Sequence, residues 1–533
     1  MSGCLVRGVR LVDVVPPRPA TGAGAGTSPM TPTAPRTPTA PRNPGPGTAE
    51  ETVDVRIVDG IVTQVEAGLT ARPGESVHDG GGRWAVPGLW DAHVHMGQWA
   101  AATTRFDLAE ATSVAHACGI VARQVATMSR DRPGTICGFG HRTATWPEQP
   151  TVASLDEVTR DVPVVLISGD CHSGWLNSVA LSLLGLAPRE DVVVEQEWFD
   201  VFPLLEERLP GLAERAVAGY RQASAEAVAK GITGVVDLEF ARGVDLWPAR
   251  FSSDRVDALR VRVGTYADGL DDVIAAGLRT GDEIGESGGL LTMGPLKIIS
   301  DGSLNTRTAY CCEPYADGDE LPHPAGVQNV DFHDLRLLLG RAAAHGLDVA
   351  LHAIGDAAVR DALDAFEVTR ARGTIEHAQL MCWDDMPRMG RLGITASVQP
   401  AHLWDDRDVA RRCWPDRMDR CFPFRSLAAN GVPLALGSDA PVSPLDPWLA
   451  MAAAVHRSAD AREPWMPHQA LTVAEALGAS TDGQGTIGRG SRGDLVLLDA
   501  DPYAVPDDSA EAAAALREIH VAATFVAGRL VHG

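Results

Sequence analysis

The chain has 533 residues, of which 45% are hydrophobic and 22% charged, with a formal net charge of −24 at pH 7. This length and composition predict a globular protein with one large domain and a smaller attachment. The strong negative charge argues against nucleic acid or an anionic membrane as a partner, so we expect a soluble, acidic protein.

The N-terminal residues, MSGCLVRGVRLVDVVPP, lack the apolar run of a secretory signal. The chain contains no stretch of about 18 consecutive apolar residues, so we expect no membrane-spanning helix. Nine cysteines are scattered along the chain, and we expect the neighbours Cys311 and Cys312 to be reduced. These features predict a cytoplasmic protein without a disulfide framework.

Residues 16–50 consist almost entirely of Pro, Ala, Thr and Gly, which predicts an exposed, disordered insertion. Strand-like runs flank it, CLVRGVRLVDVV before and VDVRIVDGIVTQVEAG after, the second with a turn at Asp59 and Gly60. The C-terminus repeats this texture in DLVLLDADP, IHVAATFVAG and RLVHG. We therefore expect the two chain ends to form one small sheet domain.

Between these ends, strand-like runs alternate with Ala- and Leu-rich helical stretches, which predicts an α/β fold with a parallel sheet. The runs in chain order are AVPGLWDAHVH, GITGVVDLEF, VRVGTYAD, LKIISDG, LDVALHAIGD, GTIEHAQL, ITASVQP and VPLALGSDAP. Eight repeats predict a closed (β/α)8 TIM-type barrel over residues 87–489. The long insertion at about residues 100–230, with helical segments such as LAERAVAGYRQASAEAVAKG, is expected to cap the barrel mouth.

The segment LWDAHVHMGQ places two histidines one residue apart at the end of the first run. Side chains alternate along a strand, so His93 and His95 should point the same way. Two imidazoles aimed at one point indicate a metal site.

Further candidate ligands fall where barrel active sites are built, at the C-terminal ends of the strands. Lys297 lies in the fourth run, and His352, His377 and Asp439 end the fifth, sixth and eighth. Each alone has an ordinary explanation as a hydrogen-bonded or capping residue, but together they predict a site. Neutral imidazoles and a carboxylate suit Zn²⁺ or a similar divalent ion that keeps a position open for water.

These motifs resemble the metal-dependent amidohydrolase superfamily, and within it the YtcJ-like or amidohydrolase 3 family. The resemblance runs through PGLWDAHVH, DCHSGWLNSVAL, GITGVVDL, LKIISDGSLNTRTA, LHAIGD, IEHAQL, SVQPAH and LGSDAPVSPLDPW. It implies a barrel with a small β-sandwich made from residues 1–86 and 490–533. It also implies hydrolysis of a non-peptide C–N bond in an amide, an N-substituted formamide or a cyclic amide.

The resemblance also implies one or two divalent ions. The residues it implies as metal ligands are His93, His95, His352, His377 and Asp439. Lys297 occupies the position at which many relatives carry a carbamylated lysine that bridges two metals. The alternative is an ordinary lysine paired with Asp301 or another acid.

In the implied mechanism a metal-activated hydroxide attacks the carbonyl carbon, and Asp439 carries a proton from the water to the departing nitrogen. His172 is implied as a catalytic donor to the carbonyl oxygen. The resemblance places Trp175, Asp301 and Arg307 near the substrate, and His402, which follows the seventh run, is a further candidate by its strand-end position. For Trp175 a plain packing role is an equal alternative, and His402 either faces the substrate or supports a ligand.

Two other functions stay open at this point. The same metal barrel can cleave a C–O bond of an ester or lactone, because function resides in sites grafted onto folds. A metal-free family member can also serve as a binding or regulatory protein. For the assembly, a homodimer is the default expectation.

Overall fold

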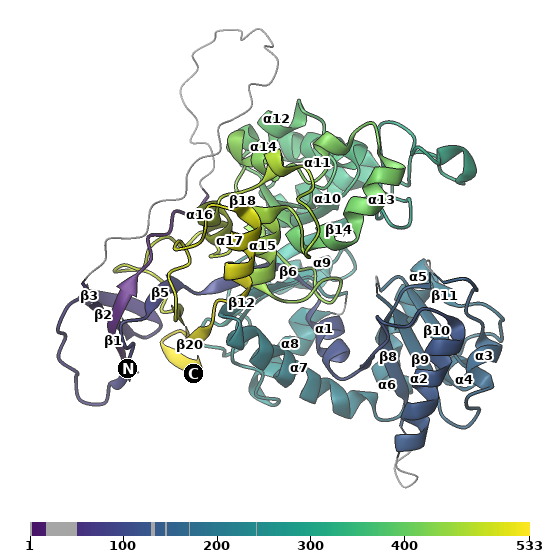
Figure 1. The fold of residues 1–533 in the computed structure, drawn as a ribbon, viewed down its shortest axis with the longest axis horizontal. Helices are drawn as coiled ribbons and strands as arrows, with labels where there is room; N and C mark the ends of the chain where they lie inside the picture. Colours follow the sequence, from purple (N-terminus) through teal and green to yellow (C-terminus); the bar gives the residue numbers. More distant parts are fainter. Residues whose placement is uncertain (1–2, 18–50, 129–133, 144–145, 170, 241) are drawn as a thin grey trace.

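The computed structural model describes residues 3–17, 51–128, 134–143, 146–169, 171–240 and 242–533. Nearly all of the expected low-complexity insertion, residues 18–50, lies outside the described residues. The described chain forms an eight-stranded parallel sheet, an eight-stranded sheet from both chain ends and a five-stranded sheet within the insertion (Figure 1).

The parallel sheet confirms the eight predicted barrel strands. They are β6 (Leu89–Val94), β12 (Ile232–Asp237), β13 (Arg260–Thr265), β14 (Leu291–Ile299), β15 (Val349–Ala353), β16 (Gly373–His377), β17 (Thr395–Val398) and β18 (Leu434–Leu436). Each strand pairs with the next in chain order, and an isolated parallel bridge between Val94 and Ala440 closes the ring. The runs are apolar because strands of a covered parallel sheet are buried on both faces.

The seam between β6 and β18 brings the two ends of the barrel sequence together. The amide of Asp439 donates to the carbonyl of His93 over 2.8 Å, and the amide of His95 donates to Ala440 over 3.0 Å. The buried Asp91 carboxylate accepts from the amides of His93 at 3.1 Å and Ser438 at 2.9 Å. Three of the predicted ligands are thus fixed by one seam.

Helices cover the outside of the barrel. Those between or after its strands are α1 (Met96–Thr103), α7 (Leu212–Ala229), α8 (Gly243–Ser252), α9 (Leu270–Ala275), α10 (Phe332–Ala344), α11 (Asp356–Thr369), α12 (Asp385–Leu392), α13 (Asp406–Cys413), α14 (Phe424–Ala429), α15 (Pro447–His456), α16 (Val473–Ala479) and α17 (Ser509–Arg517). Helix α10 shows why these stretches are helical. Asp331 caps its first turn, and Leu335, Leu339 and Ala342 recur on one buried face.

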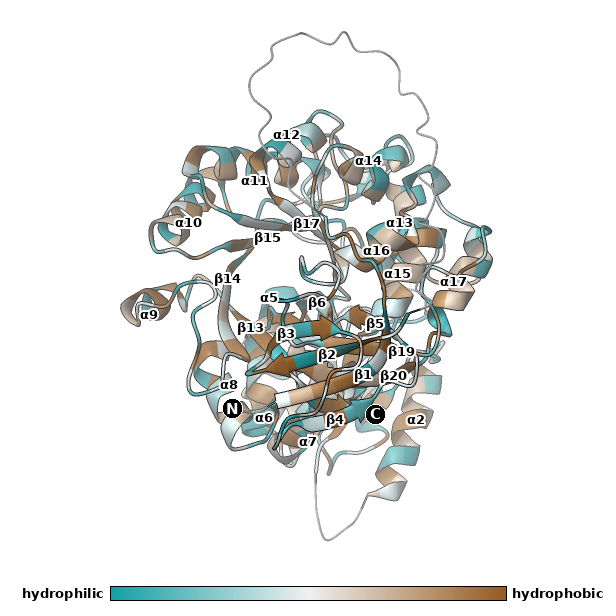
Figure 2. Cartoon of the chain, turned by 90° about the vertical axis from the view of Figure 1, so that its left-hand side faces the viewer, coloured by the Kyte–Doolittle hydropathy of each residue, from teal (hydrophilic) through white to brown (hydrophobic). Residues whose placement is uncertain are grey.

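Both chain ends contribute to the second sheet, as the sequence predicts. Its strands are β1 (Gly3–Leu11), β2 (Val53–Val58), β3 (Ile61–Glu66), β4 (Ser76–Asp79), β5 (Trp84–Pro87), β19 (Leu495–Leu498), β20 (Val521–Val526) and β21 (Arg529–His532). Strand β1 pairs with β2, β4 and β5, and β5 also pairs with β19 in antiparallel orientation. Figure 2 shows hydrophobic residues along β1 and β5. The first predicted run therefore contains two strands, β5 of this sheet and β6 of the barrel.

The insertion contains a sheet that the sequence analysis did not anticipate. Its strands are β7 (Phe106–Asp107), β8 (Ile136–His141), β9 (Val164–Ser168), β10 (Ser173–Leu176) and β11 (Val193–Val194), with α2 (Val114–Thr127), α3 (Val152–Asp156), α4 (Ser178–Leu184), α5 (Glu195–Val201) and α6 (Leu205–Arg208). Strands this short carry little periodic signal. The insertion has its own core around Trp175 and Trp198, whereas Tyr220 and Ala223 of α7 belong to the barrel core.

Two expectations about the chain as a whole can be compared with this fold. All nine cysteines have free thiols, including Cys311 and Cys312. Among the described residues, no helix combines the length and the apolar character that crossing a membrane requires.

Candidate metal centre and active site

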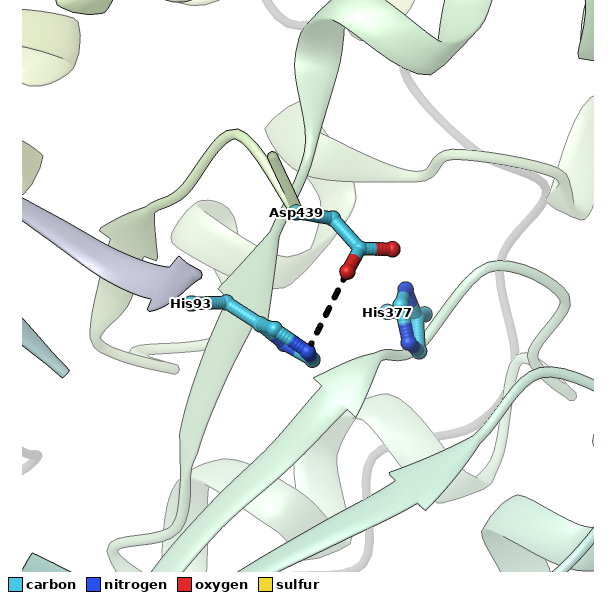
Figure 3. Close-up of side chains that lie close together, drawn as sticks. All are labelled: His93, His377 and Asp439. Carbon is cyan, nitrogen blue, oxygen red and sulfur yellow. Dashed lines mark ion pairs between the residues drawn. The ribbon is translucent and has the colours of Figure 1, made fainter. Parts of the chain in front are cut away.

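Three predicted ligands from three different strand ends meet inside the barrel. His93 ends β6, His377 ends β16, and Asp439 follows β18. One ligand atom from each lies within 4.8 Å of the others, and all three residues are buried. Figure 3 shows the two imidazoles and the carboxylate close together, with Nε2 of His93 3.4 Å from Oδ1 of Asp439.

Two more histidines face the same carboxylate. Nε2 of His95 lies 3.3 Å from Oδ1 of Asp439, so His93 and His95 do turn to the same side, as strand alternation predicts. His402, in the short helix η4 (Pro400–Trp404) after β17, approaches the other oxygen, with Nε2 3.7 Å from Oδ2. Asp439 therefore lies at the centre of the histidine cluster.

Backbone conformation turns two of these ligands inward. His377 has φ +70° and Asp439 has φ +58°, both in the left-handed region that non-glycine residues rarely adopt. The turn at His377 breaks the strand alternation, so Glu376 and His377 both reach the interior. Such strain is typical of functional sites, where the surrounding structure holds it in place.

Glu376 is a site residue that the sequence analysis missed. Nδ1 of His93 donates to Oε2 of Glu376 over 2.7 Å, and Thr374 donates to the other carboxylate oxygen. This bond fixes the His93 ring and leaves Nε2 directed at Asp439. The residue stands beside His377 in IEHAQL, but simple alternation suggests that only one of two neighbours can face the site.

Lys297 of β14 reaches the same cluster. Its side chain is buried, and Nζ lies 3.3 Å from Nε2 of His93. Burial lowers the pKa of its amine, against the opposing charges of Glu376 and Asp439. The chain has only two lysines among its 46 basic residues, and the other, Lys230, is half-exposed and paired with Asp446. An arginine at position 297 would keep its charge, whereas this lysine can become neutral.

His352 lies next to His377, with ring centroids 4.5 Å apart. Its Nε2 lies 3.2 Å from the carbonyl oxygen of Gly302 and 3.4 Å from Oδ1 of Asp301. A proton on Nε2 would satisfy these acceptors and leave Nδ1 available as a ligand. The carboxylate of Asp301 also accepts backbone N–H bonds, from Tyr310, Ile354 and Gly355. Asp301 therefore organises the loops around His352.

The electrostatics of the cluster fit a divalent cation. Burial lowers the pKa of His93 and His377 and brings that of His352 to about 3, which keeps these imidazoles neutral. Although its burial acts in the opposite direction, the surrounding histidines hold the pKa of Asp439 well below its ordinary value. Nδ1 of His377 is buried and has no hydrogen-bond partner among the described residues. A buried unpaired nitrogen among neutral imidazoles and one carboxylate matches the donor set that Zn²⁺ prefers.

Arg307 and Trp175 form hydrogen bonds with residues outside this cluster. The Arg307 guanidinium donates to the carbonyl of Asn305 and to Asp317 within its own loop. Trp175 is fully buried in the insertion, where its indole N–H donates to Thr151. Trp175 thus packs in the core of the insertion.

His172 also belongs to the insertion, and its Nδ1 lies 3.1 Å from a carboxylate oxygen of Glu195. A series of ring contacts connects it to the cluster. His172 contacts Phe199, Phe199 stacks on Phe240, and Phe240 stacks on His95, with centroids 5.2, 5.7 and 5.4 Å apart. His172 is therefore connected to His95 through two phenylalanine rings.

Comparison with known proteins identifies the family. The sequence profile of the amidohydrolase family matches residues 76–532, which includes the barrel and most of the sheet from both chain ends. The chain belongs to the amidohydrolase family. All residues of the buried cluster lie within the matched range, so the cluster occupies the barrel of an amidohydrolase-family hydrolase.

Three curated proteins are similar to this chain over most of their length. LONG AFTER FAR-RED 3 of Arabidopsis thaliana is 29% identical, with 85% of this chain and 82% of the relative covered. The putative amidohydrolase YtcJ of Bacillus subtilis is 27% identical (84% and 88% covered). The N-substituted formamide deformylase of Arthrobacter pascens is also 27% identical (88% and 92%).

Two solved structures of metal-dependent hydrolases share the fold. The protein from Pyrococcus horikoshii is 26% identical, with a TM-score of 0.72 and 85% of this chain and 94% of that chain covered. The protein from Pyrococcus furiosus is 25% identical, with a TM-score of 0.69 and coverage of 84% and 95%. Both support the amidohydrolase barrel described above.

Proposed function

We propose that this amidohydrolase-family protein hydrolyses a non-peptide C–N bond of a small molecule and requires a divalent metal ion, with an N-substituted formamide as the leading substrate type. The observation that carries the proposal is the convergence of His93, His377 and Asp439 within 4.8 Å, with an unpaired imidazole nitrogen among them. The similarity to an N-substituted formamide deformylase supports the choice of bond.

The metal would be held by the residues that surround Asp439. The proposed ligands are His93, His95, His352, His377 and Asp439, with Lys297 as a bridging carbamate if two ions bind. A bound divalent ion supplies Lewis acidity, which polarises a carbonyl group and acidifies a water molecule. Glu376 holds His93 in the orientation that this role requires.

Asp439 is the proposed proton carrier. Its lowered pKa keeps it ionised near neutral pH, so it can accept the proton that the attacking water loses. We assign that proton to Oδ2, the oxygen that faces His402. The water oxygen bonds to the carbonyl carbon, the C–N bond breaks, and Asp439 delivers the proton to the departing nitrogen. The products are a carboxylic acid and an amine.

A comparison of bond types tests the proposed reaction. Purified protein supplied with Zn²⁺ would be assayed with N-butylformamide, δ-valerolactone and the dipeptide Gly-Pro, with product release as the readout. The proposal expects butylamine and formate from the formamide at the highest kcat/KM. Hydrolysis of the lactone alone would instead support the C–O reaction, and cleavage of the dipeptide alone would identify a peptidase.

A further inference from the structure

A cavity of about 150 Å³ lies between the insertion and the barrel, next to the proposed metal centre. Phe199 and Phe202 line it from the insertion, and Phe240 and Tyr220 line it from the barrel. Phe240 also stacks on His95, so the cavity begins one ring away from a proposed ligand.

The walls of the cavity are mainly apolar, with several aromatic side chains, and the charged residues around it are of both signs. Trp198 and Leu205 extend the apolar wall, whereas Glu206 and Glu239 face Arg105, Arg215 and Arg250 around the same space. Because no single sign of charge dominates, the cavity suits a neutral group. Its volume is comparable to the cavity of about 150 Å³ that accepts benzene in another protein.

One polar atom of a cavity-lining residue has no partner among the described residues. The hydroxyl of Tyr220 is buried and forms no hydrogen bond with any described residue. Tyr220 as a whole is only 2% exposed. A Cβ built on Gly97 would lie 3.0 Å from this hydroxyl and 2.8 Å from Oε2 of Glu239. Gly97 thus allows both polar atoms to approach the backbone of α1 closely. A buried hydroxyl without a partner is costly unless a water or a ligand satisfies it.

We propose that this cavity is the subsite for the nitrogen substituent of the substrate, and that it takes a neutral group of about one ring with a hydrogen-bonding edge directed at Tyr220. The inference rests on the proposed C–N hydrolase function, because it assigns one end of that substrate. The reacting carbonyl would lie at the Asp439 cluster, and the substituent would extend past Phe240 into the cavity.

Binding of two small probes tests the subsite without any reaction. Phenol and toluene would be titrated into the full-length protein by calorimetry. Ala216→Leu on α7 and Ala101→Leu on α1 fill the cavity from two walls, and Ala218→Leu, at an exposed position of α7, is the matched control. Both filling variants should bind both probes at least about ten-fold more weakly than wild type and control. Thermal unfolding of each variant verifies folding.

The Tyr220→Phe variant tests the hydrogen-bonding edge. The substitution should weaken phenol binding several-fold and leave toluene binding unchanged. Phenol can form a hydrogen bond with the Tyr220 hydroxyl of wild type, whereas toluene has no hydrogen-bonding group. Equal binding of both probes by wild type and by the two filling variants, or no binding by wild type, would overturn the subsite.

Kinetics connect the subsite to the reaction. The ratio of kcat/KM for N-cyclohexylformamide to that for N-methylformamide should fall about ten-fold in Ala216→Leu and stay unchanged in Ala218→Leu. An unchanged ratio in both variants would overturn the role in substrate binding. If wild type hydrolyses neither formamide but still binds phenol in the cavity, the failure lies with the proposed function and the cavity remains a ring-binding site.

Discussion

Nδ1 of His93 donates a buried hydrogen bond of 2.7 Å to Oε2 of Glu376. The two residues are far apart in sequence and come from β6 and β16, so the bond depends on the closed barrel. It also determines which nitrogen of His93 is left for a metal.

Glu376→Gln tests this relationship. The amide removes the charge that stabilises the imidazole, so metal affinity should fall about 10- to 100-fold while the fold is retained. Competition with a chromophoric chelator measures the affinity. The matched control is Glu367→Gln on the exposed side of α11, where the carboxylate pairs with Arg388. Equal affinity in both variants would exclude Glu376 as a positioning residue.

Asp439→Asn tests the proton carrier. The amide cannot accept the proton of the attacking water, so kcat should fall roughly 10²- to 10⁴-fold, with folding retained and part of the metal still bound. Steady-state assay and elemental analysis of the same sample separate the two effects. Asp384→Asn, at an exposed position before α12, should behave as wild type. Near-normal turnover by Asp439→Asn would remove this residue from the mechanism.

Much of this site could be predicted from the sequence because barrel active sites collect at strand ends. The paired His93 and His95, and the strand-end positions of His377 and Asp439, were visible in the order of apolar runs. Glu376 was not visible, because a left-handed residue at position 377 breaks the alternation on which the prediction relied.

The insertion was the least predictable part of the fold. Its strands are short, and β7 pairs with β8 rather than with a barrel strand. A family resemblance suggested His172 and Trp175 as site residues, with packing as an equal alternative for Trp175. The structure buries Trp175 in the insertion, where its indole N–H donates to the carbonyl of Thr151. The contact of Phe199 with Phe240 depends on how the insertion meets the barrel, which residue patterns do not encode.

Lys297 gives a prediction that depends on pH and carbon dioxide. Carbamate formation needs a neutral amine. Because burial lowers the pKa of Lys297, its amine becomes neutral at a lower pH than that of an exposed lysine, and the neutral fraction rises with pH. At fixed dissolved CO₂, metal uptake should therefore be faster at pH 8.5 than at pH 6.5.

The two lysines of the chain provide the variant and its control. If wild type binds two ions, Lys297→Met should bind about one equivalent fewer and lose the response to CO₂. Lys230→Met changes only the exposed lysine beside Asp446 and should keep both. A full metal complement in Lys297→Met would show that the lysine does not bridge two ions.

Asp301→Asn should act mainly on stability. The carboxylate accepts amide hydrogens from Tyr310, Ile354 and Gly355, and an asparagine would place an NH₂ group against at least one of them. We expect the free energy of unfolding to fall by about 1–3 kcal/mol, measured by urea denaturation. Unchanged stability together with a raised KM would instead indicate direct contact with the substrate.

The central claim is that the cluster around Asp439 binds metal, and elemental analysis of the purified full-length protein tests it most directly. Metal equivalents per chain would be counted before and after chelation, with circular dichroism to verify folding and His93→Ala for comparison. We predict about one or two equivalents in wild type, loss on chelation with the fold retained, recovery with added Zn²⁺, and a lower content in His93→Ala. A folded protein that contains no metal and takes up no Zn²⁺ would contradict the account and favour a metal-free binding role.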